Sequence, residues 1–420
     1  MKIHLGTADN GQAFSLPLEA LRQHLIAIGG TGSGKTVFCK AVVEEAIRYR
    51  LPVIAVDMQG DLLSLANHSD ALPDGAVPVS DVTRAKYRER CDVKIWTPAS
   101  EIGIPVSFAP PMDIPASLNV EERTRTIGGI ARGLGNVIDT DNKVTISVFY
   151  QIIDFADEFG IPCESIEDFR TLLNDCPDVL GRNLDDLMSE KMRSKTAGLF
   201  GVAMTGEEGL NYSMGRPLDI REMFGQLGDD GPVATGRARL SIVYLNHLSP
   251  ENQQRFLALL FSSLYSWMLT QGDCLSGLLY VDEIASICPP VKKTPAKESL
   301  MLLLRQARKY GLCCLLATQT PGDVDYRAMS QCFTQAIGNV QGDTPVAKVQ
   351  SLMSAWPNVN VDELLKRVKS ASRGEFIVTN PNYLDAPTAI QARWLATEHR
   401  LVKPEDVEAM TDAKERETLG

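Results

Sequence analysis

The sequence has little of what a zinc protein or a secreted protein needs. Its nine cysteines include no Cys-x2-Cys pair, and its five histidines are scattered, with no His-Glu-x-x-His arrangement. These absences argue against a zinc site. Cys313 and Cys314 lie inside an apolar run, which indicates buried thiols in a reducing compartment. We therefore expect a cytoplasmic protein.

Long apolar runs and an excess of positive charge are also missing. No apolar run approaches the length needed to cross a bilayer, and the first residues show no charged-then-apolar signal sequence, so we expect no membrane segment. The net charge of −11 weakens nucleic-acid binding by the surface as a whole. It does not exclude such binding, because a ring can be acidic outside and basic in its channel.

The strongest local pattern is residues 29–36, Gly-Gly-Thr-Gly-Ser-Gly-Lys-Thr, which fits the Gly-x4-Gly-Lys-Thr phosphate-binding loop. The apolar run at 25–28 predicts a buried strand before the loop. A helix is predicted after it, with Phe38, Val42, Ile47 and Tyr49 toward the core. The residues left for its solvent face are Glu44, Glu45, Arg48 and Arg50.

The spacing of this loop has a direct chemical reason. Glycines let the backbone curl so that consecutive N–H groups point at phosphate oxygens, and the helix N-terminus adds partial positive charge. Lys35 reaches the β- and γ-phosphates, and the Thr36 hydroxyl ligates Mg²⁺. The loop therefore predicts a nucleoside triphosphate bound with Mg²⁺. The residues assigned to it are Gly30, Thr31, Gly32, Ser33, Gly34, Lys35, Thr36 and Val37.

An acidic pair, Asp282-Glu283, ends the apolar run at 278–281. A carboxylate at this place beside the phosphate loop can hold the Mg²⁺ shell, which is the role expected for Asp282. Glu283 can polarise the attacking water, as a hydrolase requires. The alternative is a strand end followed by a helix-capping acid, but the upstream loop favours the catalytic interpretation.

Two more polar residues end predicted strands. Gln319 follows the run at 312–318 and can sense the γ-phosphate or position water, or it can be simply a polar strand end. Asp57 ends the run at 52–57 on the same side by topology. For Asp57 a place in the site and a turn-capping role are equally open.

Basic residues gather between 284 and 311, where six of them accompany one acidic residue. Arg305 and Arg308 lie three apart, hence on one helical face, and one of them can be an arginine finger supplied to a neighbouring subunit. The alternative is a solvated or ion-paired face. The Pro-Pro-Val-Lys-Lys-Thr-Pro stretch reads as an exposed loop, which is either solvated or a contact for a phosphate backbone. The candidate DNA contacts are Lys292, Lys293 and Lys297.

Strands that alternate with helices predict an α/β fold with a largely parallel sheet and helices on both faces. We expect a short lead-in over 1–24, a first part of the core over 25–109, a mostly helical insertion with a mobile loop over 110–234, a second part of the core over 235–396, and a charged tail over 397–420. Glycine and aspartate at 60–61 also predict the opening of a helix.

Several motifs in this order resemble the HerA/FtsK group of ring-forming P-loop ATPases, with HerA-like bacterial proteins the nearest match. The resemblance rests on the phosphate loop and on five further stretches: Val-Asp-Met-Gln-Gly-Asp-Leu (56–62), Leu-Tyr-Val-Asp-Glu (279–283), Arg-Gln-Ala-Arg-Lys-Tyr-Gly (305–311), Ala-Thr-Gln-Thr-Pro-Gly-Asp-Val (317–324) and Arg-Gly-Glu-Phe-Ile-Val (373–378).

This resemblance implies a RecA-like core, a hexameric ring with ATP sites between subunits, and translocation on double-stranded DNA driven by hydrolysis. It also implies a nuclease or another effector as partner, in DNA processing or phage defence. Full HerA proteins carry an N-terminal β-barrel, which the first 24 residues here cannot form.

Two alternatives stay open beside the DNA motor. One is an ATPase of the type IV secretion or conjugation type, and the other is a nucleotide-gated scaffold that assembles an effector and hydrolyses slowly. A GTPase is disfavoured, because no Asn-Lys-x-Asp sequence follows the core.

Overall fold

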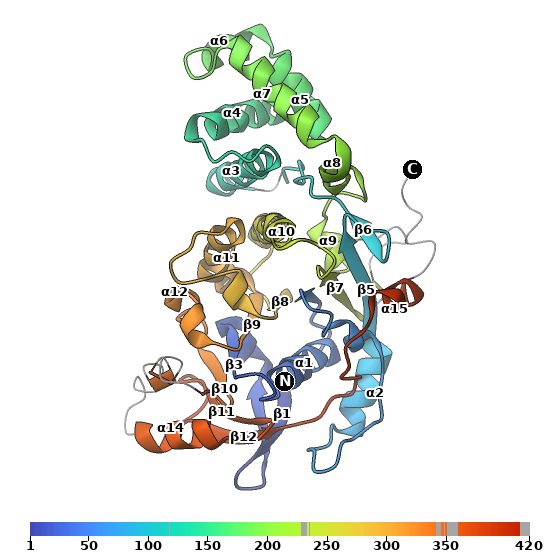
Figure 1. Ribbon diagram of the computed structural model, residues 1–420, viewed down its shortest axis with the longest axis vertical. Coiled ribbons are helices and arrows are strands. Elements are labelled where there is room, and N and C mark those ends of the chain that lie inside the picture. The colour runs from blue at the N-terminus through green and yellow to red at the C-terminus, as the bar shows by residue number, and fades with distance from the viewer. Residues whose placement is uncertain are drawn as a thin grey trace.

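A computed structural model describes residues 1–116, 118–227, 233–234, 236–341, 346–347, 349–350 and 360–411 (Figure 1). Half of the mobile loop that the sequence predicts over 225–236, namely 228–232 and 235, lies outside this part of the chain, as do the last residues of the predicted tail, 412–420. None of the helices in the described part has the length and apolarity that a membrane crossing requires.

One twelve-stranded sheet organises the chain. Its strands are β1 (Lys2–Ala8), β2 (Ala13–Pro17), β3 (Leu25–Ile28), β4 (Val53–Asp57), β5 (Cys91–Pro98), β6 (Ile104–Val106), β7 (Ala238–Tyr244), β8 (Gly277–Val281), β9 (Leu312–Thr318), β10 (Thr334–Ile337), β11 (Glu375–Thr379) and β12 (Thr388–Ala392). Their order across the sheet is β2-β1-β12-β11-β10-β3-β9-β8-β4-β7-β5-β6.

The sheet is parallel over its larger part. Every pairing from β10 across to β6 is parallel, whereas β11, β12, β1 and β2 pair in antiparallel fashion at one side. The carboxyl ends of β3, β9, β8 and β4 therefore meet at one edge, where ligands bind in such sheets.

Helices cover both faces of the sheet. On one face α10 (Pro250–Leu269) and α11 (Pro295–Gln306) pack against Ile26, Val56 and Leu316. On the other face α1 (Lys35–Arg48) packs against Ala27, Ala55 and Leu315. The alternation of these buried side chains along each strand is what two covered faces require. The predicted α/β fold with helices on both faces is confirmed.

Within the described ranges, the core also has shorter helices. These include α2 (Asp81–Arg90), α9 (Ile220–Met223), α12 (Tyr326–Met329), α14 (Val361–Ser370) and α15 (Pro404–Met410).

The predicted helical insertion stands at one end of the molecule, as the green helices of Figure 1 show. It comprises α3 (Val120–Val137), α4 (Lys143–Phe159), α5 (Ile166–Asn174), α6 (Asp178–Leu184), α7 (Glu190–Ala203) and α8 (Gly206–Ser213). Its own apolar core centres on Phe149, Phe169 and Phe200, whose rings pack with centroids 5.0 to 5.7 Å apart. Helices α3 to α8 thus pack around a core of their own.

Two local expectations are wrong. The helix predicted to open at 60–61 is only a 3₁₀ turn, Leu63–Ala66, because Asp57 binds the backbone N–H groups of the preceding loop. Glu44 and Glu45 do not face solvent, since both are fully buried beneath the segment that follows β12 and are paired with Arg393.

Candidate functional site

The phosphate loop lies between β3 and α1, as its sequence predicts. The Gly29 N–H continues the β-ladder to Thr318 O at 3.2 Å, and the Gly30 N–H donates to Asn339 O at 2.7 Å. Gly32 and Gly34 have φ of 78° and 93°, a left-handed conformation that favours glycine. The loop therefore curls at the N-terminus of α1, where its remaining N–H groups and the helix dipole favour anions.

The segment before β11 presses directly on this loop. The Gly374 N–H donates to Ser33 O at 2.7 Å, and a Cβ at Gly34 would lie only 2.9 Å from Gly374 N. Arg373 is consequently anchored beside the phosphate loop with an exposed side chain. The sequence predicted no role for this arginine. Its Arg-Gly dipeptide was visible, but the contact joins residues about 340 positions apart.

Glu283 reaches the phosphate loop from β8. One of its carboxylate oxygens, Oε2, lies 3.4 Å from Lys35 Nζ and 3.3 Å from the Gln319 backbone N–H, and Oε1 accepts from Thr318 Oγ1 at 3.2 Å. Its backbone has φ 53° and ψ 66°, which is uncommon for a residue with a side chain. Such strain is maintained where the surroundings fix it, and here three donors fix the carboxylate.

Asp282 supplies the second carboxylate of the predicted pair. Burial raises its pKa above the usual range, and the charge of Lys35 opposes that rise. Its Oδ1 is buried with no hydrogen-bond partner among the described residues. A buried carboxylate oxygen without a donor fits a hard cation, and the partly exposed Thr36 hydroxyl is the second expected ligand. The residues present therefore fit Mg²⁺ bound together with nucleotide phosphates.

Gln319 lies at the carboxyl end of β9, the strand between β3 and β8. The Thr31 hydroxyl of the phosphate loop donates to its Oε1 at 2.7 Å. The predicted sensor thus contacts the loop through its side chain and Glu283 through its backbone.

Asp57, for which two roles were open, binds its own loop. Its carboxylate accepts backbone N–H groups from Gln59, Gly60, Leu62 and Leu63 at 2.6 to 3.1 Å. Burial raises its pKa to about 6, against the effect of those bonds. All four donors belong to the loop, so the geometry favours the turn-capping role.

Arg305 and Arg308 lie far from the phosphate loop of their own chain. Arg305 belongs to the last turn of α11, and Arg308 belongs to the 3₁₀ turn Ala307–Tyr310. Both precede β9, whose seven residues span about 20 Å before reaching Thr318. Both side chains are exposed, and the Arg308 guanidinium lies 5.5 Å from the Phe333 ring centre.

The three candidate DNA-contacting lysines separate into two groups. Lys292 and Lys293 are exposed in the loop between β8 and α11, as predicted. Lys297 is buried, and its Nζ forms an ion pair with Asp325 Oδ2 at 2.9 Å. The prediction for Lys297 is therefore wrong in this structure, because its ammonium group is already neutralised and is shielded from a phosphate backbone.

The site combines a phosphate loop after one parallel strand, an Asp-Glu pair two strands away, and a polar residue on the strand between them. This arrangement defines a P-loop ATPase. The sequence model of the family "Helicase HerA-like C-terminal" matches residues 2–413, and the chain belongs to this family. Over 100 residues the chain is 33% identical to the "Probable helicase MJ1565" of Methanocaldococcus jannaschii. That match covers 24% of this chain and 19% of the relative, so only about a fifth of the relative's length is spanned.

Solved structures with this fold include VirB4 and a bacterial conjugative coupling protein, TrwB. VirB4 of Thermoanaerobacter pseudethanolicus superposes with a TM-score of 0.57 at 11% identity, over 94% of this chain and 96% of that one. The unbound conjugative coupling protein TrwBΔN70 gives 0.54 at 15% identity, over 96% and 91%. TrwB in complex with ADP and Mg²⁺ gives 0.53 at 15% identity, over 93% and 89%. At these identities the likeness concerns the fold.

Proposed function

We propose that this chain forms a hexameric ring that hydrolyses ATP at subunit interfaces and thereby moves along double-stranded DNA. A nuclease or another effector is the proposed partner. The family supports the ATPase part of this proposal, and the arrangement around Glu283 carries the hydrolytic part. The carboxylate is held within hydrogen-bond reach of the groups that bind the γ-phosphate, where a water-activating base has to lie.

The residues divide the chemistry among them. The loop N–H groups and Lys35 bind and orient the triphosphate, and Thr36 and Asp282 are the proposed ligands of Mg²⁺, which when bound neutralises phosphate charge. Glu283 orients and deprotonates the attacking water, and Gln319 senses the γ-phosphate. Arg373, anchored on Gly34, is a further candidate for contact with the phosphates.

The distribution of charge indicates which part of the chain contacts DNA. Residues 110–234 contain 22 of the 53 acidic residues and 11 of the 42 basic residues. That segment therefore has a net charge of −11, equal to that of the whole chain, and the rest of the chain is neutral. The insertion would repel a phosphate backbone, so we place DNA contacts on the core, at the exposed Lys292 and Lys293.

Replacement of Glu283 by Gln tests the proposal. Loss of the base while the hydrogen-bonding shape remains should lower the ATPase kcat at least about 100-fold and leave ATP binding intact. Glu101→Gln is the matched control, because Glu101 is an exposed glutamate outside the site. Hydrolysis that is undiminished in Glu283→Gln, measured by phosphate release, removes the base assignment.

A second candidate function is that of a conjugation-type or secretion-type ATPase, which the fold likeness to TrwB and VirB4 favours. Duplex DNA separates the candidates. A DNA translocase should hydrolyse ATP several-fold faster when duplex is added at low salt, since motor ATPases couple turnover to the polymer that they bind. A rate that duplex leaves unchanged counts against translocation and favours the second candidate.

A further inference from the structure

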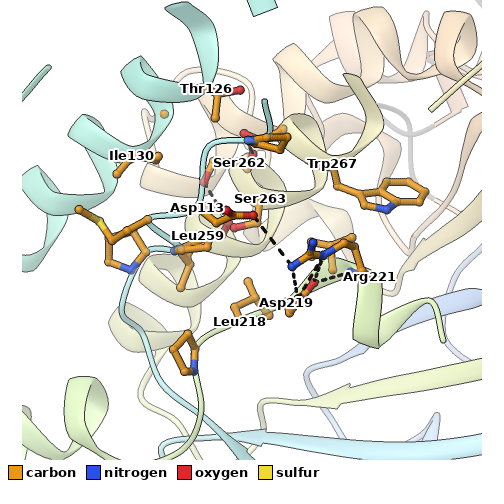
Figure 2. A pocket seen from close by; sticks show the side chains of 18 of the residues that line it. Asp113, Thr126, Ile130, Leu218, Asp219, Arg221, Leu259, Ser262, Ser263 and Trp267 are labelled. Carbon is orange, nitrogen blue, oxygen red and sulfur yellow. Dashed lines mark hydrogen bonds and ion pairs between the residues drawn. The ribbon is translucent and has the colours of Figure 1, made fainter. Parts of the chain in front are cut away.

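A cavity of about 410 Å³ lies where the helical insertion joins the core (Figure 2). Its walls come from α3, from α10 and from the segments 110–115 and 217–221 that connect the insertion to the sheet. The C-terminal half of α10 lines it, and α10 runs from the carboxyl end of β7 toward the amino end of β8. The cavity is therefore separate from the phosphate loop, and its volume is within the range of ligand pockets.

Two buried hydroxyl groups in the cavity wall have no partner. Thr126 of α3 is 1% exposed and Ser263 of α10 is 7% exposed, and neither side-chain oxygen forms a hydrogen bond among the described residues. Buried polar groups without partners cost free energy, so each such group requires an explanation. Here the two residues lie on helices from opposite sides of the junction and both line the same cavity, although the two oxygens themselves are covered by neighbouring atoms.

Three other hydroxyls in the wall can only accept hydrogen bonds. Ser262 donates to Leu259 O at 2.9 Å, Ser266 donates to Ser262 O at 3.2 Å, and Thr270 donates to Trp267 O at 2.7 Å. Each hydroxyl has a single proton, which is already donated, so toward a ligand these oxygens can act only as hydrogen-bond acceptors. Along α10 the cavity is therefore rich in acceptors.

Carboxylates continue this acceptor-rich lining. Asp113, Glu164 and Asp219 line the cavity, with Arg221 as their one basic neighbour in the lining. Arg221 is bound to Asp219 at 2.8 Å and is 4.0 Å from Asp113 Oδ2, as the dashed lines in Figure 2 show. Three acids and one base leave a formal excess of two negative charges, which disfavours phosphates and nucleotides.

We propose that this cavity binds a protonated aliphatic amine. An ammonium group has three donors and no acceptor, which matches a wall of lone pairs and carboxylates. Its apolar stem would pack on Leu259 and on Trp267, whose indole face also attracts cations. The amine can be a free diamine or the lysine side chain of a partner segment, since both present the same chemistry.

Ligand-observed NMR with the full-length protein tests the proposal. The probes are 1,5-diaminopentane, pentan-1-ol and pentanoate, together with two blocked pentapeptides that carry lysine or norleucine at the centre. The amine should bind at least about tenfold more tightly than the alcohol, and pentanoate should not bind, because the differences between these probes are electrostatic. Binding of the lysine peptide but not of the diamine assigns the site to a partner segment, and the reverse assigns it to a free amine.

Matched variants locate the binding. Asp113→Asn with Glu164→Gln removes two exposed carboxylates from the cavity and should weaken amine binding about tenfold. Asp141→Asn with Glu158→Gln removes the same charge from exposed positions of the insertion that do not line the cavity, and should change binding less than about twofold. Equal binding of amine and alcohol, an equal loss in both double variants, or no binding of any amine probe overturns the proposal.

Discussion

At the scale of single residues, His24 is a titratable side chain buried in the core, with a hydrogen-bond partner for each ring nitrogen. The Cys314 N–H donates to its Nδ1 at 3.1 Å, and its Nε2 lies 3.1 Å from Leu304 O. The ring must therefore be neutral with its proton on Nε2. Burial is the main cause that lowers its pKa to about 4, and the charge of Arg308 acts in the same direction.

This burial predicts a loss of stability in mild acid. The unfolded histidine has a pKa near 6.5, so His24 contributes its full stabilisation above that pH and loses it as the pH falls toward about 4. The free energy of unfolding should decrease by about 2 kcal/mol from this group between roughly pH 7 and pH 5. Urea titrations at both pH values measure it.

The control for this prediction is His24→Asn. Asparagine does not titrate, and because it has a Cβ as histidine does, the substitution leaves the same backbone restriction at φ 55° and ψ 150°. The variant should be less stable than the parent at neutral pH, and the difference between the two proteins should shrink in acid. A difference that is independent of pH contradicts the assigned protonation state.

Other residues show what sequence can and cannot predict about the site. Residues 29–36 and the pair Asp282-Glu283 are recognisable because each is a short stretch at the end of one strand. Lys297 was misassigned because its partner, Asp325, follows a different strand. No residue close to Lys297 in the sequence therefore indicates that its side chain forms an ion pair. Arg373 was missed because its contact is also between segments that are distant in sequence. Its position beside Gly34 depends on the antiparallel strands β11 and β12, which bring this segment to the phosphate loop.

At the scale of elements, α1 departs most from its pattern. Its charged residues predict a solvent-facing side, yet Glu44 accepts from Arg393 at 2.7 Å and from the backbone N–H groups of Ala396 and Thr397 at 2.8 and 3.0 Å. A buried charge has to be paired and hydrogen-bonded, and this one is. Helical periodicity predicts which face of α1 is apolar. It cannot predict that a segment about 350 positions away in the sequence covers the polar face as well.

The loop between β8 and α11 joins the active site to the proposed DNA contact. Replacing Lys292 and Lys293 together by Ala should weaken duplex binding and lower the slope of log affinity against log salt by about 2, because each lysine that neutralises a phosphate releases about one counterion. Fluorescence anisotropy across a salt series measures this slope.

The same variant should keep its ATPase rate in the absence of DNA, because neither lysine is placed in the nucleotide site. Lys191→Ala with Lys195→Ala on α7 is the matched control, since it removes two exposed charges from the acidic insertion. An equal loss of affinity in both variants would show that DNA responds to net charge and not to this loop.

At the scale of the whole molecule, the position of Arg305 and Arg308 bears on assembly. Both precede β9, at the edge of the sheet opposite the phosphate loop, so neither can complete the ATP site of its own chain. If either acts on the γ-phosphate, it does so across an interface. In such a head-to-tail interface the donor and acceptor surfaces are different patches, and repeating it generates a ring when the rotation between subunits closes.

Mixing inactive subunits tests this arrangement. Arg308→Ala subunits keep an intact phosphate loop, and Lys35→Ala subunits keep an intact Arg308, so each should be inactive alone. In a ring assembled at random from equal amounts, about a quarter of the interfaces join an intact loop to an intact arginine, and the ATPase rate should recover toward that fraction. Arg308→Ala mixed with the Lys35→Ala/Arg308→Ala double variant contains no intact pair and should stay inactive. Full activity of Arg308→Ala alone, with the same result for Arg305→Ala, would eliminate both arginines as fingers and leave Arg373, which is anchored beside the phosphate loop, to test.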